Sequence, residues 1–165
     1  MLSKNLVKKL NDHVNLEFYS SNLYLQMSSW CEARGLDGCA AFLGAHSKEE
    51  AGHMERLFTY VNETGSMAVI GEIKAPPTEF KSVGELFKMV YDHECFITKE
   101  INGLVSAALK EGDYSTFNFL QWYVAEQHEE EHIFKQILDK IAIIGEKGTG
   151  LFFIDRAVAE MLRKK

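Results

Sequence analysis

Apolar residues recur every three to four positions along most of the chain, and this spacing is typical of α-helices with one buried face. Segments with this pattern predict long helices over about residues 3–34, 37–64, 82–111 and 113–144. Gly35 and Gly65 follow the first two segments and supply stop signals. Ser82 and Glu85 form a capping box at the start of the third. We therefore expect the chain to fold mainly as long, uninterrupted helices.

The segment at 65–81 contains both prolines of the chain and separates the second predicted helix from the third. At about 3.3 Å per residue it can travel the height of a bundle, so these two helices are expected to run parallel. This arrangement predicts an all-α four-helix bundle with one long crossover, formed by residues 1–145. Residues 146–165 are expected to add a short amphipathic helix to the same domain. That helix packs either on the end of its own bundle or against other copies of itself.

The first predicted helix carries more apolar surface than a bundle interior needs. The residues that lie off its buried face are Leu16, Tyr19, Leu23, Leu25 and Trp30. This excess predicts contact with a partner subunit, although scattered exposed apolar residues are also common on monomers.

Polar side chains interrupt the apolar face near the middle of every long predicted helix. Glu50 and His53, one helical turn apart, share a stripe with His46 and apolar neighbours. Buried carboxylates cost several kcal/mol unless a partner charge or a metal ion lies beside them. In a bundle, the interrupting positions would meet at one level. They are Glu17, Glu50, His53, Glu94, Gln127 and Glu130.

The two halves of the chain repeat this arrangement at a spacing of 77 positions (17 to 94, 50 to 127, 53 to 130). Under this shift Glu17 corresponds to Glu94. Glu50 corresponds to Gln127, and His53 to Glu130. The chain therefore resembles one helix pair written twice, with a polar residue at each inward position.

This set offers four carboxylates, one imidazole and one amide. An oxygen-rich set with one nitrogen and no thiolate suits iron or manganese and tolerates zinc. Two divalent ions would balance the carboxylate charges and leave coordination positions open for dioxygen. The pattern therefore predicts a buried two-metal site.

The composition is compatible with this interpretation and narrows it. The chain has 165 residues, 46% hydrophobic and 25% charged, as expected for one globular domain. Its net charge of -6 argues against nucleic acid and anionic membrane surfaces as partners. Three separated cysteines predict reduced thiols and a cytoplasmic location. Residues 1–10 contain no apolar run, so neither a secretory signal nor a membrane span is expected there.

Over essentially its whole length, the chain resembles bacterial non-haem ferritin. The motifs that carry the resemblance are Glu17, Tyr24, Glu50-Ala51-Gly52-His53, Glu94 and Gln127-His128-Glu129-Glu130. The resemblance implies the ferritin-like bundle and a hollow shell of twenty-four subunits. It also implies that the subunits are ferroxidases, which oxidise iron(II) with dioxygen or hydrogen peroxide and store the product as a ferric mineral.

The resemblance also implies a role for each site residue. Glu17, Glu50 and His53 resemble the ligands of a first iron, and Glu50, Glu94 and Glu130 those of a second. Gln127 resembles an amide beside the centre, and Tyr24 a one-electron donor. A third iron site is implied by a set of carboxylates, namely Glu49, Glu126, Glu129 and the shared Glu130.

The chain departs from the haem-containing relatives at two places, so no haem is expected. Ala51 stands where their haem methionine would be, and Gln127 to Glu130 replaces their second Glu-x-x-His. Without a second imidazole, the second iron is expected to bind more loosely than the first, so that iron passes through the centre.

Other interpretations compete with this one. Glu126 and Glu129 lie off the apolar stripe and fit an ordinary solvated face, and Tyr24 fits an ordinary core tyrosine. His128-Glu129-Glu130-Glu131-His132 matches the His-Glu-x-x-His pattern of zinc metalloproteases, with His128 and His132 as ligands. However, both histidines lie roughly 90° or more from the inward stripe.

A different ferritin-like protein is a further alternative. A mini-ferritin of the DNA-protecting type would place its ligands between subunits, whereas the positions found here lie within one chain. A rubrerythrin-like peroxidase would need four cysteines for its additional iron, and this chain has three. A metal-free bundle does not account for polar residues on four apolar stripes.

Overall fold

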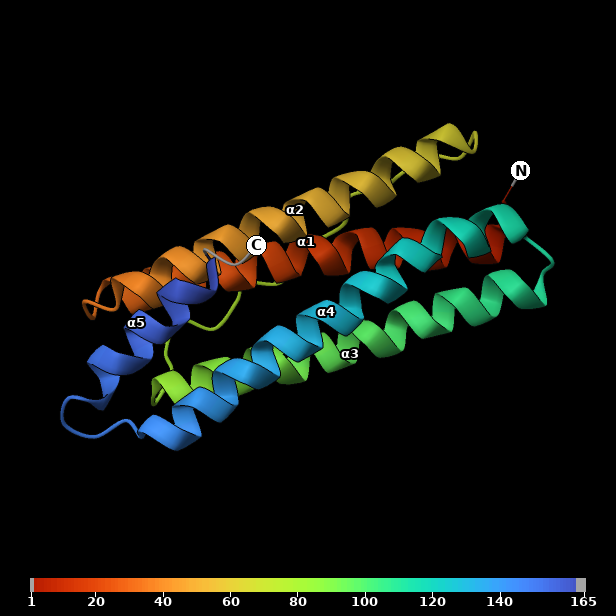
Figure 1. The fold of residues 1–165 in the computed structure, drawn as a ribbon. Helices are drawn as coiled ribbons and strands as arrows, with labels where there is room; N and C mark the ends of the chain where they lie inside the picture. Colours follow the sequence, from red (N-terminus) through yellow and green to blue (C-terminus); the bar gives the residue numbers. More distant parts are fainter. Residues whose placement is uncertain (1, 163–165) are drawn as a thin grey trace.

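The computed structural model describes residues 2–162 and contains helices but no strand within that range. The helices are α1 (Lys4–Glu32), α2 (Asp37–Glu63), α3 (Val83–Lys110), α4 (Tyr114–Ile144) and α5 (Gly150–Leu162). The four long helices lie side by side as a bundle, and α5 lies across one end of it (Figure 1). The segment between α2 and α3 returns along the bundle, so these helices run parallel. The predicted fold, a four-helix bundle with one long crossover and a short fifth helix, is confirmed.

Local signals in the sequence explain where the helices begin and end. The Ser82 hydroxyl accepts a hydrogen bond from the Glu85 N–H at the start of α3, and Asp113 accepts one from Thr116 at the start of α4. After α2, Gly65 adopts a φ of 80°, in the left-handed region that favours glycine. Because each break is encoded locally, the long helices remain separate units that pack on one another.

Two apolar clusters fill the bundle on either side of a polar layer. The cluster nearer α5 includes Phe42, Phe87 and Phe134. The cluster at the opposite end includes Leu10 and Leu120. Burying apolar surface contributes roughly 25 cal/mol per Å² to the free energy of folding, so these clusters stabilise the packing of the helices. This packing fixes the rotation of each helix and the level at which the polar residues meet.

The apolar excess predicted on α1 is smaller than the sequence pattern indicates. Leu23 and Trp30 are buried within the chain itself, and the Trp30 ring lies 5.6 Å from that of Phe80 in the α2–α3 connection. The helical pattern does not show this contact because the connection has no periodicity of its own. Leu25, by contrast, is 58% exposed.

Helix α5 packs on α2 and α4 at the end of its own bundle. Its Asp155 carboxylate accepts hydrogen bonds from the backbone N–H groups of Gly38 (3.0 Å) and Cys39 (2.8 Å), in the first turn of α2. A Cβ at Gly38 would lie 2.3 Å from the Asp155 carbonyl oxygen, so a larger residue there would displace α5.

Among the helices within residues 2–162, none has the length and apolar character to cross a membrane.

Candidate metal centre

The middle of the bundle is a layer of buried polar side chains from all four long helices. Each of the six inward positions is at most 4% exposed, and Tyr24 is fully buried. The six are Glu17, Glu50, His53, Glu94, Gln127 and Glu130. Charged groups reach this depth because their helices are held by the apolar clusters above and below.

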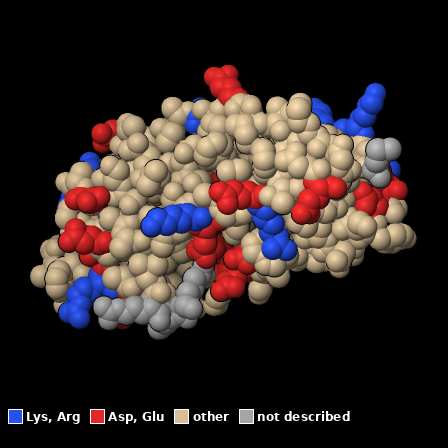
Figure 2. Space-filling view, turned by 90° about the horizontal axis from the view of Figure 1, so that it is seen from above, with Lys and Arg blue, Asp and Glu red and all other residues tan. Residues whose placement is uncertain are grey.

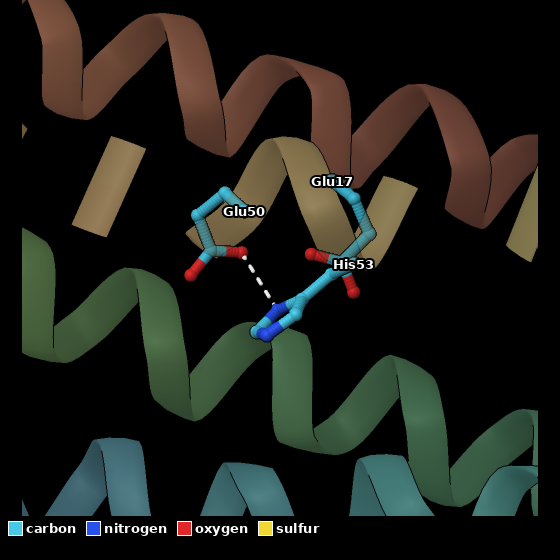
Figure 3. A group of neighbouring side chains, drawn as sticks. All are labelled: Glu17, Glu50 and His53. Atoms are coloured by element: carbon cyan, nitrogen blue, oxygen red, sulfur yellow. Dashed lines mark ion pairs between the residues drawn. The ribbon is translucent and has the colours of Figure 1, made fainter. Parts of the chain in front are cut away.

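Glu17, Glu50 and His53 converge between α1 and α2, and Figure 3 shows their polar ends facing one another. One potential ligand atom from each residue lies within 4.8 Å of those of the other two. The Nδ1 atom of His53 is 3.3 Å from Oε2 of Glu50. Carboxylate oxygens and an imidazole nitrogen at this separation could share one first-row metal ion.

A further buried histidine, which is not one of these three residues, is hydrogen-bonded to Glu17. The Nε2 atom of His13, one turn before Glu17, lies 2.9 Å from Glu17 Oε1, and His13 is itself buried. Burial acts to raise the pKa of Glu17, but the hydrogen bond and charge of His13 hold that pKa below its ordinary value. The sequence pattern did not single out His13, although its spacing of four residues from Glu17 was a usable signal.

Glu94 is held by hydrogen bonds instead. The Tyr24 hydroxyl donates to one of its carboxylate oxygens, and Gln127 Nε2 donates to the other at 2.9 Å. Burial, followed by the charge of Glu130, raises the pKa of Glu94 to about 8. Burial and the adjacent Glu94 raise the pKa of Tyr24 well above its ordinary value, so this phenol keeps its proton and remains a donor.

The layer contains more carboxyl groups than its neighbours can stabilise in the ionised form. Burial, then the charges of Glu94 and Glu17, raise the pKa of Glu50 well above its ordinary value. The Oε2 atom of Glu17 and Oε1 of Glu50 are buried and find no hydrogen-bond donor among the described residues. His93 does not compensate, because burial lowers its pKa to about 4 and it stays neutral beside Ser20. A bound cation is the direct way to stabilise this arrangement.

Glu130 belongs to a second group of converging side chains. His46 Nε2 lies 3.4 Å from Glu130 Oε2 and 3.8 Å from Glu49 Oε2. His46 was placed on the inward stripe by the sequence but given no role. Of the carboxylates expected at a third iron site, Glu49 and Glu130 are in this group, whereas Glu126 is half-buried and Glu129 is exposed outside it.

The residues of the His-Glu-x-x-His motif do not converge on a site. His128, Glu129 and His132 are exposed on α4, and His132 Nε2 shares a hydrogen bond of 2.8 Å with Gln136. Within residues 2–162, neither histidine takes part in a cluster of potential metal ligands.

Comparison with known proteins agrees with the fold and with the geometry of the polar layer. A model of the ferritin-like domain matches residues 7–144. A Haemophilus influenzae protein named as a probable bacterial non-heme ferritin-like protein is 58% identical over 164 residues, covering 99% of each chain. The bacterial non-heme ferritin of Campylobacter jejuni is 54% identical over 167 residues, covering 100% of each.

Solved structures give the same result. Chlorobium tepidum ferritin is 54% identical, with a TM-score of 0.87, and covers 100% of this chain and 99% of its own. The open-pore ferritin of Archaeoglobus fulgidus is 39% identical, with a TM-score of 0.93, and covers 96% of this chain and 98% of its own. The similarity therefore extends over the bundle and the fifth helix alike.

Proposed function

The chain belongs to the ferritin family, and from this premise we propose that it stores iron by oxidising iron(II) in the polar layer of its bundle. The observation that carries the proposal is the convergence of Glu17, Glu50 and His53 in a dry interior next to further carboxylates. Buried acidic groups in this number are costly to ionise unless cations lie beside them. Iron is the substrate here, and it is held while it is oxidised.

Two iron(II) ions are proposed to bind in the layer. Glu17, Glu50 and His53 hold the first, and Glu50, Glu94 and Glu130 hold the second, so that Glu50 serves both. The charges of Glu17 and Glu94 both act on Glu50, which supports its position between the two halves. Each ion gives up one electron, and dioxygen or hydrogen peroxide accepts the pair.

Tyr24 and Gln127 are proposed to orient Glu94 for the second ion. Both side chains donate hydrogen bonds to that carboxylate, and such contacts fix the direction of a ligand. The buried phenol of Tyr24 is also placed to supply a single electron when only one iron is present. Gln127 serves as an amide beside the centre.

Oxidised iron is proposed to leave toward a groove of about 1280 Å³ whose walls include Glu49, Glu129 and His46. The third iron site expected from Glu49, Glu126, Glu129 and Glu130 would lie on this side of the bundle. With Ala51 at the haem methionine position, we propose that no haem is bound.

Assembly into a hollow shell, proposed to contain twenty-four copies, would cover apolar side chains that the single chain leaves exposed. They include Met67, Val69 and Ile70 in the α2–α3 connection and Phe152 and Phe153 on α5. On the face shown in Figure 2, acidic side chains lie along the molecule with basic ones between them, so this face offers a polyanion no continuous positive surface. Free thiols at Cys31, Cys39 and Cys95 support a reducing, cytoplasmic environment.

Aerobic addition of iron(II) to purified, metal-free protein tests this function. We expect rapid growth of ferric absorbance and a hollow particle of many subunits, with mineral retained inside the particle on gel filtration. Slow oxidation at the rate of buffer alone, or a monomer that leaves its iron in solution, would contradict the proposal.

A further inference from the structure

We propose that His13 is a positioning residue for the first metal ion and that it makes Glu17 a ligand through one oxygen only. His13 occupies one carboxylate oxygen of Glu17 and leaves the other for the ion. This inference rests on the proposed function, which assigns Glu17 to the first ion. It gives a role to a side chain that does not itself bind the metal.

The hydrogen bond between His13 and Glu17 joins two buried side chains one helical turn apart on α1. His13 Nε2 lies 2.9 Å from Glu17 Oε1. His13 is 3% exposed, and Glu17 is fully buried. In its ionised form the carboxylate can only accept a hydrogen bond, so Nε2 is the donor. Because little water reaches this depth to compete, the contact fixes the direction of the carboxylate.

The other oxygen of Glu17 has a different environment. Oε2 is buried and meets no hydrogen-bond donor among the described residues. One potential ligand atom of Glu17 lies within 4.8 Å of those of Glu50 and His53, and Figure 3 shows the carboxylate facing these two side chains. Since His13 already holds Oε1, an ion in this group would be bound through Oε2. A hydrogen bond to the second oxygen is a common way to orient a carboxylate ligand.

The contact has no equivalent in the second half of the chain. The repeat of 77 positions places Val90 where His13 stands (13 to 90), and Val90 is fully buried in the apolar cluster nearer α5. Glu94, which corresponds to Glu17, has both oxygens engaged by other donors. An apolar side chain therefore satisfies the packing at this position, and packing alone does not account for the histidine.

His13 also lines a cavity of about 460 Å³ between α1 and α3. Because His13 contacts both the cavity and Glu17, a much smaller side chain would open the carboxylate to water. Substitutions that test the hydrogen bond must therefore keep most of the side-chain volume. The other walls of the cavity include Lys9, Leu16, Lys99 and Leu104.

A carboxylate limited to one oxygen also affects which ion is bound. Calcium takes about six to eight oxygen ligands and often binds both oxygens of one carboxylate. Zinc and other first-row transition ions accept a single carboxylate oxygen together with an imidazole nitrogen. By withholding Oε1, His13 removes a ligand that calcium uses and a transition ion does not need. We therefore expect His13 to act on selectivity as well as on affinity.

Zinc(II) soaked into crystals of the assembled, metal-free protein provides the first test, because it shows which oxygens of Glu17 the ion uses. In the wild type we expect zinc at about 2.0–2.2 Å from one oxygen, with the other still in contact with His13. In His13→Leu, which loses the donor but stays bulky, both oxygens should approach the ion. His13→Gln, whose amide nitrogen can donate in place of Nε2, should restore the wild-type arrangement.

Calorimetric titrations with zinc(II) and calcium(II) give the corresponding solution result. His13→Leu should weaken the tightest zinc binding by about 10-fold, because the carboxylate is no longer held in place, without weakening calcium binding. His13→Gln should recover most of the zinc affinity. Lys99→Ala, which removes an exposed wall residue of the same cavity, is the matched control and should change neither ion. Helical circular dichroism checks that each variant folds.

The outcomes separate this inference from the proposed function. Zinc bound among Glu17, Glu50 and His53 through the same single oxygen, and with the same affinity, in the wild type and in folded His13→Leu would refute the inference alone. Equal losses in His13→Leu and His13→Gln would also refute it, since the hydrogen bond would then not be the cause. A wild-type protein that takes up no zinc in this group would refute the proposed function and the inference with it.

Discussion

The two helix pairs carry the same pattern of inward polar residues, but they hold their carboxylates by different means. In α1 and α2, the potential ligand atoms of Glu17, Glu50 and His53 face one another directly. In α3 and α4, the corresponding Glu94 is occupied by hydrogen bonds from Tyr24 and Gln127. In the first pair, Glu17 and Glu50 each keep one carboxylate oxygen without a hydrogen-bond donor, whereas in the second pair both oxygens of Glu94 accept hydrogen bonds.

The difference predicts that two helix pairs with similar inward polar positions bind ions unequally. An ion entering the first pair meets an imidazole and carboxylate oxygens without a donor. An ion entering the second must share Glu94 with the two donors that orient it, and its proposed ligands Glu50, Glu94 and Glu130 do not include a histidine. We therefore expect the first ion to bind tightly and the second to bind loosely, so that iron is released after oxidation.

Removing the residue common to both halves should have the largest effect. Glu50→Ala takes a ligand from both ions, so the fast phase of iron(II) oxidation should slow by about 100-fold or more. Stopped-flow absorbance measures this rate, and Glu50→Gln, which keeps the side-chain volume, controls for packing. If either folded variant oxidised iron at the wild-type rate, Glu50 would not belong to the centre.

Replacing one carboxylate from each half should reveal the inequality itself. In anaerobic titrations the wild type should bind iron(II) at two affinities. Glu17→Gln should weaken the tighter one by about 10- to 100-fold, and Glu94→Gln should weaken the looser one. Two equal, tight sites in the wild type would remove the basis of the comparison, and equal losses in both variants would show that the ions do not occupy separate halves.

The sequence predicted the helices and inward carboxylates of both helix pairs, but it did not predict the contacts in which the two pairs differ. Helical spacing and glycine stops were sufficient for the long helices, and Glu17, Glu50 and Glu94 interrupt stripes that are otherwise apolar. The roles of His13 and His46 depend on contacts that the stripe alone does not show: one supports Glu17 from its own helix, and the other meets Glu130 across the bundle. Interhelical contacts depend on how each helix is rotated, and periodicity fixes that only to within about one side chain.

Removing one donor from Glu94 should have a smaller effect, confined to the second half. Tyr24→Phe keeps the ring and loses only the hydroxyl that bonds to Glu94. We expect about a 10-fold change in the weaker iron affinity and little change in the tighter one, as is usual when a residue that orients a ligand is lost. The same anaerobic titration measures both affinities. A change of equal size at the tighter site would show that Tyr24 acts on the whole layer.

The metal-free protein should lose stability as pH rises, through carboxyl groups of both halves. The pKa of Glu94 is about 8 in the folded chain, against an ordinary value near 4.5, and the pKa of Glu50 is also raised. A raised pKa means that folding favours the protonated form, so this stabilisation is complete below about pH 4.5 and is lost as pH rises toward 8.

Thermal melts of the metal-free protein should therefore show a lower Tm at pH 8 than at pH 5.5. Glu94→Gln should flatten this dependence, because its amide does not titrate. Zinc(II) at pH 8 should restore the Tm and release protons into a weakly buffered solution, since the metal replaces them. A wild-type Tm that rises steadily from pH 5.5 to 8 would contradict the pKa assignment for Glu94.

The smallest effect is expected outside the layer, at the second half's own histidines. His128 is exposed on α4, so His128→Ala should change the rate of iron oxidation by less than about twofold, within the range of ordinary surface substitutions. A zinc protease that used His128 and His132 would lose its activity in the same variant, so a casein-cleavage assay run in parallel distinguishes the two functions. A large loss of iron oxidation in folded His128→Ala would mean that the second half supplies an imidazole after all. The two helix pairs would then not differ in whether they supply an imidazole ligand.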